Sequence, residues 1–326
     1  MHRPSWLLAS CILLLLGYIA SAQSTSNLKG FSESNLGINA TITDAKSGKT
    51  EVQAITYHKT ASGQSFYRNV ESSHEFDWPY IPINTSNFIV KLPLAAIRTL
   101  TVEPESRENR VGDQRYRVTA LMENGQTSFS GNMIVVTAAS ETSSNSLGGF
   151  GNDDSLVGKT DFGSFRINFE NIRVVDFTSH QKPSAAAVKT ATPTGHAGSL
   201  LLDDGSRLEM KNIFPVANEY NANSVPQGEV RVMQIRLASA GGSETTIMLA
   251  TLAVIRFLSN NPGYRNPPGT LPELEVESIR GQQLRGVVGR KSADAFGLGG
   301  TALFGDDEYE IIVPFTTKAK QLTIRQ

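Results

Sequence analysis

The stretch Thr160–Phe177, TDFGSFRINFENIRVVDF, decides how the rest of the chain is interpreted. Apolar and polar residues alternate from Phe165 to Phe169, which is the period-two pattern of a strand with one buried face. A polar pair then interrupts the alternation before Ile172, as a single turn of helix would. The stretch therefore predicts two short strands joined by a helical turn.

The same stretch contains Asp161-Phe162-Gly163, which would bind metal in a protein kinase. A kinase also needs a glycine-rich loop, a strand lysine and a catalytic loop upstream, and the sequence has none of them. The motif therefore predicts a turn that enters the strand pair, with Phe162 covering the barrel that such strands would form.

The pattern Φ-x-Φ-x-x-Ile-Arg, with Φ apolar, recurs along the chain and supports this interpretation. Its copies are Leu92–Arg98, Ile167–Arg173 and Ala250–Arg256, with a degraded fourth copy at Val313–Ala319. Each copy is followed by another apolar run, so each predicts a strand, one helical turn and a closing strand. Repetition at this spacing is the sequence pattern of a chain built from several copies of one structural unit.

An alternating strand and a tight turn precede each copy. These starts are Ala40–Gly48, Val118–Gly125, Ser199–Gly205 and Leu274–Gly281. Asn-Gly and Asp-Gly are strong hairpin signals, because both residues accept the positive φ of a tight turn. No segment shows sustained helical periodicity.

We therefore predict an all-β protein of four tandem small antiparallel β-barrel-like repeat units. The predicted segments are a signal peptide (1–22), unit 1 with an aromatic insertion (23–104), unit 2 (111–180), a linker (181–196), unit 3 (197–260), a second linker (261–269) and unit 4 (270–326). The first linker is rich in Pro, Ala and Thr, and the second is rich in Pro, Gly and Asn. Both compositions are typical of semi-rigid spacers.

Each unit resembles a small Sm-like or SH3-like barrel, in which two strands and a turn are followed by later strands and one helical turn. Ser199–Glu209, SLLLDDGSRLE, is similar to the first Sm motif in its alternation and its Asp-Gly. The acidic-aromatic-asparagine set with which Sm proteins hold RNA has no clear match. The resemblance therefore implies a fold and not RNA binding.

The N-terminus has the pattern of a secretory signal peptide, with a basic start, a short apolar run and the small residues Ala20-Ser21-Ala22. The run is shorter than the ~20 residues that span a bilayer, so we expect no transmembrane segment after cleavage. Cys11 is the only cysteine, and Leu8–Cys11 resembles a misplaced lipobox. Without the leader, 29 basic residues face 31 acidic ones, a balance that does not favour nucleic acid.

Signals for metal or catalysis are generic. Acid pairs beside glycine at Asp153-Asp154, Asp203-Asp204 and Asp306-Asp307 leave Ca²⁺ open as an alternative to ordinary turns. Gly297–Ala302 fits a loose dinucleotide fingerprint, but a strand follows, so we expect a flexible hairpin connection. The four histidines after the leader lie far apart, and no G-x-S-x-G or H-E-x-x-H motif is present. We expect no cofactor and no enzymatic activity.

The segment Ser73–Pro82, SHEFDWPYIP, departs from the repeat pattern and is the candidate site. It holds the only tryptophan after the leader beside carboxylates and prolines, so we expect a rigid aromatic loop. Such a loop suits a protein contact or the stacking of a sugar ring, or else it packs over a barrel end. The candidate ligand-binding residues are His74, Glu75, Phe76, Asp77, Trp78 and Tyr80.

These features predict a secreted, non-catalytic repeat protein that binds or scaffolds in the periplasm or the extracellular space. The expected partner is a protein or glycan of the cell envelope. Binding of a cell-wall or matrix glycan is the alternative function, and a hydrolase is a weaker one. Glu75 and Asp77 are too close in sequence to face a glycoside from opposite sides.

Overall fold

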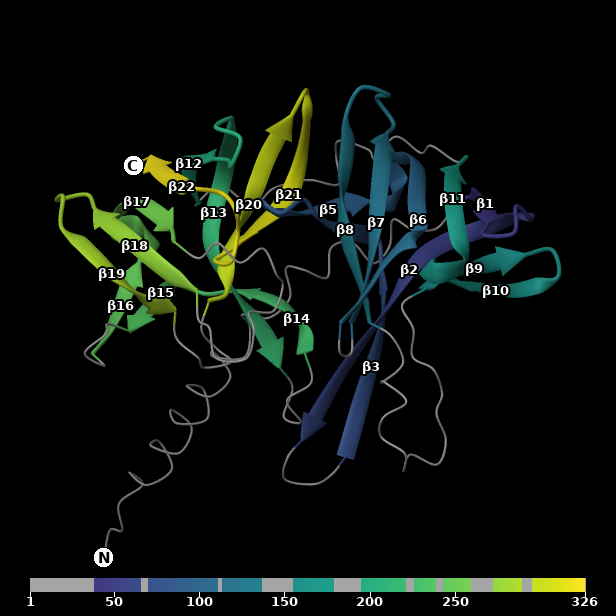
Figure 1. The fold of residues 1–326 in the computed structure, drawn as a ribbon, viewed down its shortest axis with the longest axis horizontal. Helices are drawn as coiled ribbons and strands as arrows, with labels where there is room; N and C mark the ends of the chain where they lie inside the picture. The colour runs from purple at the N-terminus through teal and green to yellow at the C-terminus, as the bar shows by residue number, and fades with distance from the viewer. Residues whose placement is uncertain are drawn as a thin grey trace, which may run out of the picture.

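The computed structural model describes residues 38–65, 70–110, 113–136, 155–178, 195–220, 226–238, 243–258, 272–288 and 295–325. The part of the chain that it describes is all-β, with no α-helix, and every strand pair is antiparallel (Figure 1). This confirms that the protein is all-β, as predicted. The predicted signal peptide, the linker 261–269 and all but the last residues of the linker 181–196 lie outside the described residues.

The strands fall into two halves along the sequence. The first half contains β1 (Ala40–Asp44), β2 (Lys49–Ser65), β3 (Val70–Trp78), β4 (Tyr80–Asn84), β5 (Ile89–Pro93), β6 (Ile97–Arg110), β7 (Asp113–Met122), β8 (Ser128–Val136), β9 (Ser155–Thr160), β10 (Gly163–Asn168) and β11 (Ile172–Phe177). The second half contains β12 (His196–Leu201), β13 (Arg207–Tyr220), β14 (Pro226–Arg231), β15 (Gln234–Ala238), β16 (Glu244–Met248), β17 (Leu252–Phe257), β18 (Glu273–Ser278), β19 (Gln283–Val288), β20 (Gly297–Phe304), β21 (Asp307–Pro314) and β22 (Gln321–Arg325).

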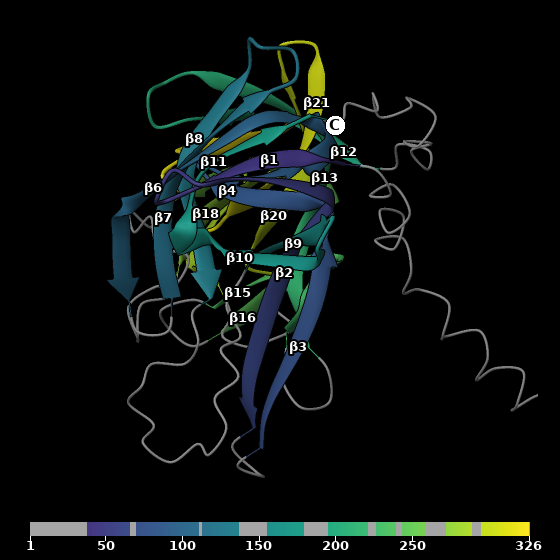
Figure 2. The ribbon, with the colours of Figure 1, turned by 90° about the vertical axis from the view of Figure 1, so that its right-hand side faces the viewer.

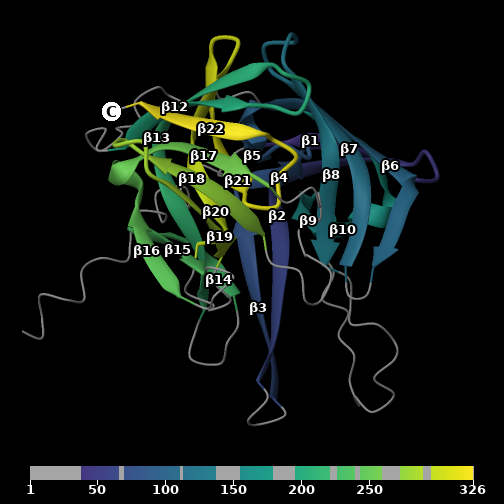
Figure 3. The same cartoon turned by 60° about the vertical axis from the view of Figure 1, so that its left-hand side comes forward.

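Hydrogen-bonded neighbours join all the strands into one antiparallel sheet that does not close on itself. From end to end its order is β10-β9-β2-β1-β11-β6-β7-β8-β4-β5-β21-β20-β13-β12-β22-β17-β18-β19-β15-β16. In addition, β3 pairs with β2, and β14 pairs with β13. The β2–β3 hairpin extends beyond the body as an arm (Figures 2 and 3).

The pairings cross the predicted unit boundaries, so four separate barrels are not confirmed. Strands β1 and β2 belong to predicted unit 1, but they pair with β11 and β9 of predicted unit 2. In the second half, β12 and β13 pair in the same way with β22 and β20. The physical reason is that alternation shows which face of a strand is buried, but not which strand lies beside it.

The two halves repeat one arrangement, and this is visible in their buried rows. Across β1, β11, β6 and β7 the row is Ile42, Val175, Leu100 and Ala120. Across β12, β22, β17 and β18 it is Leu200, Leu322, Ile255 and Val276. All eight side chains are buried, because they point to the same face of adjacent strands.

A 3-10 turn precedes the closing strand in three of the four predicted copies. These turns are η2 (Leu94–Ala96), η3 (Phe169–Asn171) and η4 (Leu249–Thr251), and the first residue of each is buried. In the fourth copy Phe315 is buried at the equivalent position. The predicted position in the third copy, after Leu252, is wrong. Apolar residues form a nearly continuous run there, so the alternation does not show where the helical turn begins.

Two other local predictions are wrong. Phe162 does not cover a core, because its side chain is fully exposed at the tip of the β9–β10 turn. Gly297–Ala302 is not a flexible connection but part of β20. A Cβ at Gly299 would lie 2.7 Å from the ring of Phe214, so glycine there permits close packing against β13.

The four predicted tight turns are confirmed, and they share one geometry. One residue in each has positive φ, and its N–H donates to the carbonyl three residues earlier. These residues are Ser47 (69°), Gly125 (67°), Gly205 (87°) and Gly281 (77°). Three copies use glycine, for which this region has no steric cost, and the first uses serine.

A substitution in the first of these turns is expected to stabilise the protein. A side chain in the left-handed region costs roughly 1–2 kcal/mol, and glycine also makes the unfolded chain more flexible. We therefore expect Ser47→Gly to raise the free energy of unfolding by about 0.5 kcal/mol. Gly205→Ala, where no atom lies within 4 Å of the added Cβ, should lower it by about 1 kcal/mol through φ alone. Urea titration measures both, and changes of the same sign would contradict the assigned turn geometry.

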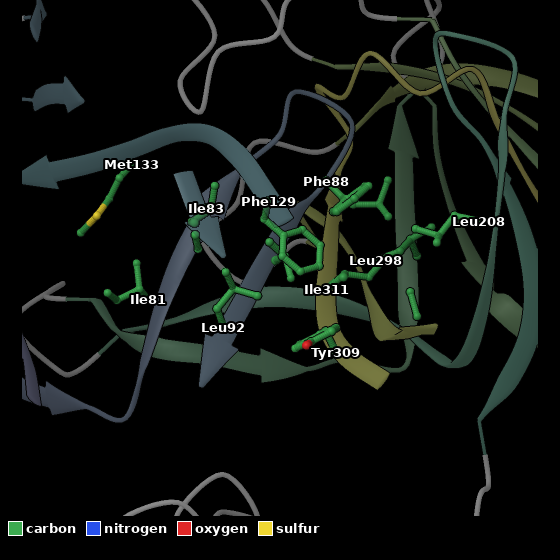
Figure 4. Close-up of a cluster of buried hydrophobic side chains, with 14 of the residues drawn as sticks. Ile81, Ile83, Phe88, Leu92, Phe129, Met133, Leu208, Leu298, Tyr309 and Ile311 are labelled. Atoms are coloured by element: carbon green, nitrogen blue, oxygen red, sulfur yellow. The ribbon is translucent and has the colours of Figure 1, made fainter. Parts of the chain in front are cut away.

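The two halves meet through strands and side chains at the middle of the body. Strands β5 and β21 pair, with Lys91 opposite Glu310. Phe129 contacts Phe304 edge to face at 4.9 Å and Tyr309 at 5.3 Å. Figure 4 shows side chains of both halves in this cluster, so the apolar core is continuous from one half into the other.

Candidate functional site

The predicted aromatic loop is not a loop, because the segment belongs to two strands. β3 ends at Trp78, Pro79 follows, and β4 begins at Tyr80. In the β2–β3 ladder Trp78 lies opposite Tyr57, and Asp77 lies opposite His58. The prolines suggested irregular structure, but Pro79 lies at the bend between strands and Pro82 is accommodated in β4.

The structure describes the side chains of three of the six candidate residues, namely Asp77, Trp78 and Tyr80. His74, Glu75 and Phe76 lie in β3, opposite Ala61, Thr60 and Lys59, and their side chains lie outside the described part. The candidate residues thus run from the arm down to its base, where the arm joins the body.

Trp78 belongs to a series of aromatic contacts at this base. It stacks on Tyr80 at 4.9 Å and meets the edge of Tyr57 at 6.0 Å. Tyr57 in turn contacts Phe169 at 5.6 Å, and both of these rings are buried. Such pairs add about 0.5–1.5 kcal/mol each beyond area burial. Trp78 therefore fixes the arm to the core, and its partly exposed ring lies at the surface.

Asp77 forms a hydrogen bond that the sequence did not reveal. Its carboxylate lies 2.9 Å from Nδ1 of His58, and the Asp77 side chain is exposed while that of His58 is mostly buried. The two residues are far apart in sequence, and only the strand register brings them together. Asp77 and Trp78 are successive residues of β3, so their side chains lie on opposite faces of the strand pair at the base of the arm.

Lys91 continues this region toward the second half of the molecule. Its side chain is only 8% exposed, and its Nζ lies 2.9 Å from Glu310 and 5.3 Å from the centre of the Tyr80 ring. Burying a cation requires such partners, because desolvation otherwise costs several kcal/mol. A lysine within the apolar run Ile89–Pro93 was a signal in the sequence that could have identified it.

A cavity of about 40 Å³ adjoins Lys91 at the junction of the two halves. Its lining residues are Lys91, Phe214, Val216, Val230, Arg231, Glu310 and Ile312. The guanidinium of Arg231 lies over the ring of Phe214 at 3.9 Å. This volume admits water-sized groups and is too small for a drug-sized ligand.

The acid pairs considered for Ca²⁺ take part in turns and in contacts between strands. Asp204 accepts hydrogen bonds from the Ser206 hydroxyl and N–H, and these lower its pKa. Asp203 bonds with Asn87, and Asp307 with Asn124. Among the described residues no group of three His, Cys, Asp or Glu side chains could hold a metal ion. Asp153 and Asp154 lie outside the described part.

Tyr309 in the central cluster gives the protein a pH dependence at alkaline pH. Burial, the charge of Asp307 and a hydrogen bond to it raise the pKa of Tyr309 to about 12. An unfolded tyrosine titrates near pH 10, so between these values the folded protein holds a proton that the unfolded chain has lost. We expect stability to fall as the pH rises from about 10 to about 12. Urea midpoints measured over this range should fall less steeply for Tyr309→Phe, and equal slopes would contradict the role of Tyr309.

Comparisons of the chain with protein-family models, with curated proteins and with solved structures find no match. In the residues that the structure describes, no helix is long and apolar enough to cross a membrane. The resemblance to Sm-like and SH3-like barrels stays a prediction.

Proposed function

We propose that the protein is a secreted, non-catalytic scaffold that binds a protein of the cell envelope or the extracellular space. The observation that supports this best is the exchange of strand partners between consecutive predicted units, as in β1–β11 and β2–β9. With the β5–β21 junction, this exchange joins all the strands into one body. A rigid body with hairpins at several positions suits the spacing and presentation of binding surfaces.

We also propose that the strands form four interleaved small barrels. The groups would be β1, β2 and β9–β11; β4–β8; β12, β13 and β20–β22; and β15–β19. Within each group the pairings follow one order, and a 3-10 turn or the Phe315 turn links the two strands at the ends of that order. Each barrel would then take two strands from one repeat of the sequence and three from the other.

The base of the arm is the proposed contact surface. Trp78 is partly exposed there, Asp77 is exposed, and the arm adds two strand edges beyond the body. An exposed charge on one face of the strand pair and a partly exposed aromatic ring on the other each offer an anchor to a protein partner. One face of Trp78 already stacks on Tyr80, which leaves less of the ring for a sugar. Glycan binding is therefore the second candidate, carried by the same tryptophan.

Co-sedimentation tests the proposal and separates the two partners. The chain from Gln23 onward is mixed with envelope membranes, with protease-treated membranes and with insoluble cell-wall glycan. Binding to membranes that protease treatment removes would support a protein partner, whereas binding to glycan would favour the alternative. The absence of binding to all three would contradict both.

Variants locate the surface without removing the packing of the arm. Asp77→Lys reverses an exposed charge, and Trp78→Phe keeps an aromatic ring against Tyr57. Both are expected to weaken binding at least several-fold, because interface anchors contribute more than about 1 kcal/mol each. Asp306→Lys, the same charge change at an exposed position on the β20–β21 turn, is the matched control and should bind as the parent does.

A further inference from the structure

Each of the two strands that meet at the middle of the molecule has an equivalent strand in the other half. β5 of the first half pairs with β21 of the second half. β5 precedes the 3-10 turn η2, and β16 precedes η4, so β16 is the counterpart of β5. Likewise β10 precedes Phe169, β21 precedes Phe315, and β10 is therefore the counterpart of β21.

Both counterparts are edges in the part of the chain that the structure describes. β10 pairs with β9 alone, and β16 pairs with β15 alone. They are the first and last strands of the hydrogen-bonded order, and they lie toward opposite ends of the long axis of the molecule (Figure 1). Exposed strand edges are templates for pairing with another chain.

We propose that β16 of one copy pairs with β10 of the next copy and thereby reproduces the internal β5–β21 junction. The occupant of each edge is thus a second copy of this chain. This assembly goes beyond the proposed envelope binding and does not depend on it, since neither edge includes the arm. Because the two surfaces are different and lie at opposite ends, the contact does not close and copies would add head to tail.

The register of the internal junction predicts which residues meet between copies. At the junction Glu310, Ile311 and Ile312 lie opposite Lys91, Val90 and Ile89. Glu310 lies five residues before Phe315, and Lys91 lies three residues before Leu94. The residues at the same distances before Phe169 and Leu249 are Ser164 and Thr246, so these two should lie opposite each other. The same register places Phe165 opposite Thr245 and Arg166 opposite Glu244. Arg166 and Glu244 therefore face each other with opposite charge, two residues along the strands from Ser164 and Thr246, the counterparts of Glu310 and Lys91.

Exposed apolar side chains occur beside the same two edges. Phe162, at the turn before β10, is fully exposed, and Met248, at the end of β16, is half exposed. Large exposed apolar side chains near a strand edge favour association. An Arg–Glu pair also makes the contact selective, because pairing two copies of one edge would place like charges near each other.

Sedimentation velocity over a series of protein concentrations tests this assembly. We expect the average mass of the assemblies that the parent chain forms to increase with protein concentration and to exceed the mass of a dimer. Arg166→Glu and Glu244→Arg should each weaken association about tenfold, because like charges replace an attractive cross-strand pair. Arg117→Glu on β7 and Glu51→Arg on β2 make the same net charge changes at exposed positions on strands other than the two edges, and these variants should associate as the parent does.

Mixing the two edge variants gives the decisive result. In a one-to-one mixture, the unchanged Glu244 of the Arg166→Glu variant meets the unchanged Arg166 of the Glu244→Arg variant. At the other contact between the variants the two substituted side chains meet, and their charges are again of opposite sign. The mixture should therefore recover the association that each variant alone has lost, with unchanged circular dichroism throughout. A parent chain that stays monomeric at the highest concentration, a closed dimer, or a mixture that does not recover would each overturn the proposal.

Discussion

Phe169→Ala is expected to lower the free energy of unfolding by about 3–5 kcal/mol, which is typical of a fully buried phenylalanine in a core. Phe169 is the first residue of η3, it is 0% exposed, and it lies 5.6 Å from the ring of Tyr57. Removing the ring leaves a cavity at a point where strands of two predicted units meet. Chemical denaturation followed by circular dichroism measures the loss.

A double-mutant cycle shows whether this loss involves Tyr57. If the two rings are in contact, Phe169→Ala and Tyr57→Leu should be non-additive by about 0.5–1.5 kcal/mol. Additive effects would contradict the contact between the two rings, which belong to different predicted units.

Phe129→Ala is expected to cost a similar amount, about 3–5 kcal/mol, because its buried ring joins the two halves of the molecule. The ring contacts Phe304 and Tyr309, both from the second half. Thermal unfolding should show the loss of stability, and both halves should be affected because they share the core.

Phe162→Ala is the matched control for both substitutions. Its ring is fully exposed, so we expect a change within about 0.5 kcal/mol. A loss as large as that of Phe129→Ala would show that Phe162 is packed, contrary to the structure.

The sequence could predict the strands and turns of this fold, because their signals are local. The alternation around Phe165–Phe169 and the glycines with positive φ, such as Gly205, depend only on neighbouring residues. The choice of partner does not. Ile42 and Leu100 would each be buried beside many different neighbouring strands, so their sequence does not identify the neighbour. Only the three-dimensional structure places β11 between them.

The candidate site could be predicted in part for the same reason. Trp78 and Tyr80 were identified because aromatic residues concentrate in one short segment. His58 and Glu310 were missed, since each meets its partner across a ladder between distant strands. The segment was expected to be a loop because of its prolines, but the pairing of β3 with the long β2 outweighs that local preference.

Disulfide trapping is the most direct test of the exchange of strands between units. The chain from Gln23 onward has no cysteine, so introduced cysteines report one contact at a time. Thr41 of β1 lies opposite Asp176 of β11, and Thr99 of β6 lies on the far side of Asp176. Opposite residues are close enough for a disulfide, whereas strands two positions apart are about 10 Å apart and too distant.

We expect Thr41→Cys with Asp176→Cys to form a disulfide readily in the folded protein, and Thr41→Cys with Thr99→Cys not to form one. A barrel closed within the first predicted unit would pair β1 with its own closing strand, β6. Rapid cross-linking of the Thr41–Thr99 pair, with none for the Thr41–Asp176 pair, would therefore contradict the exchange of strands.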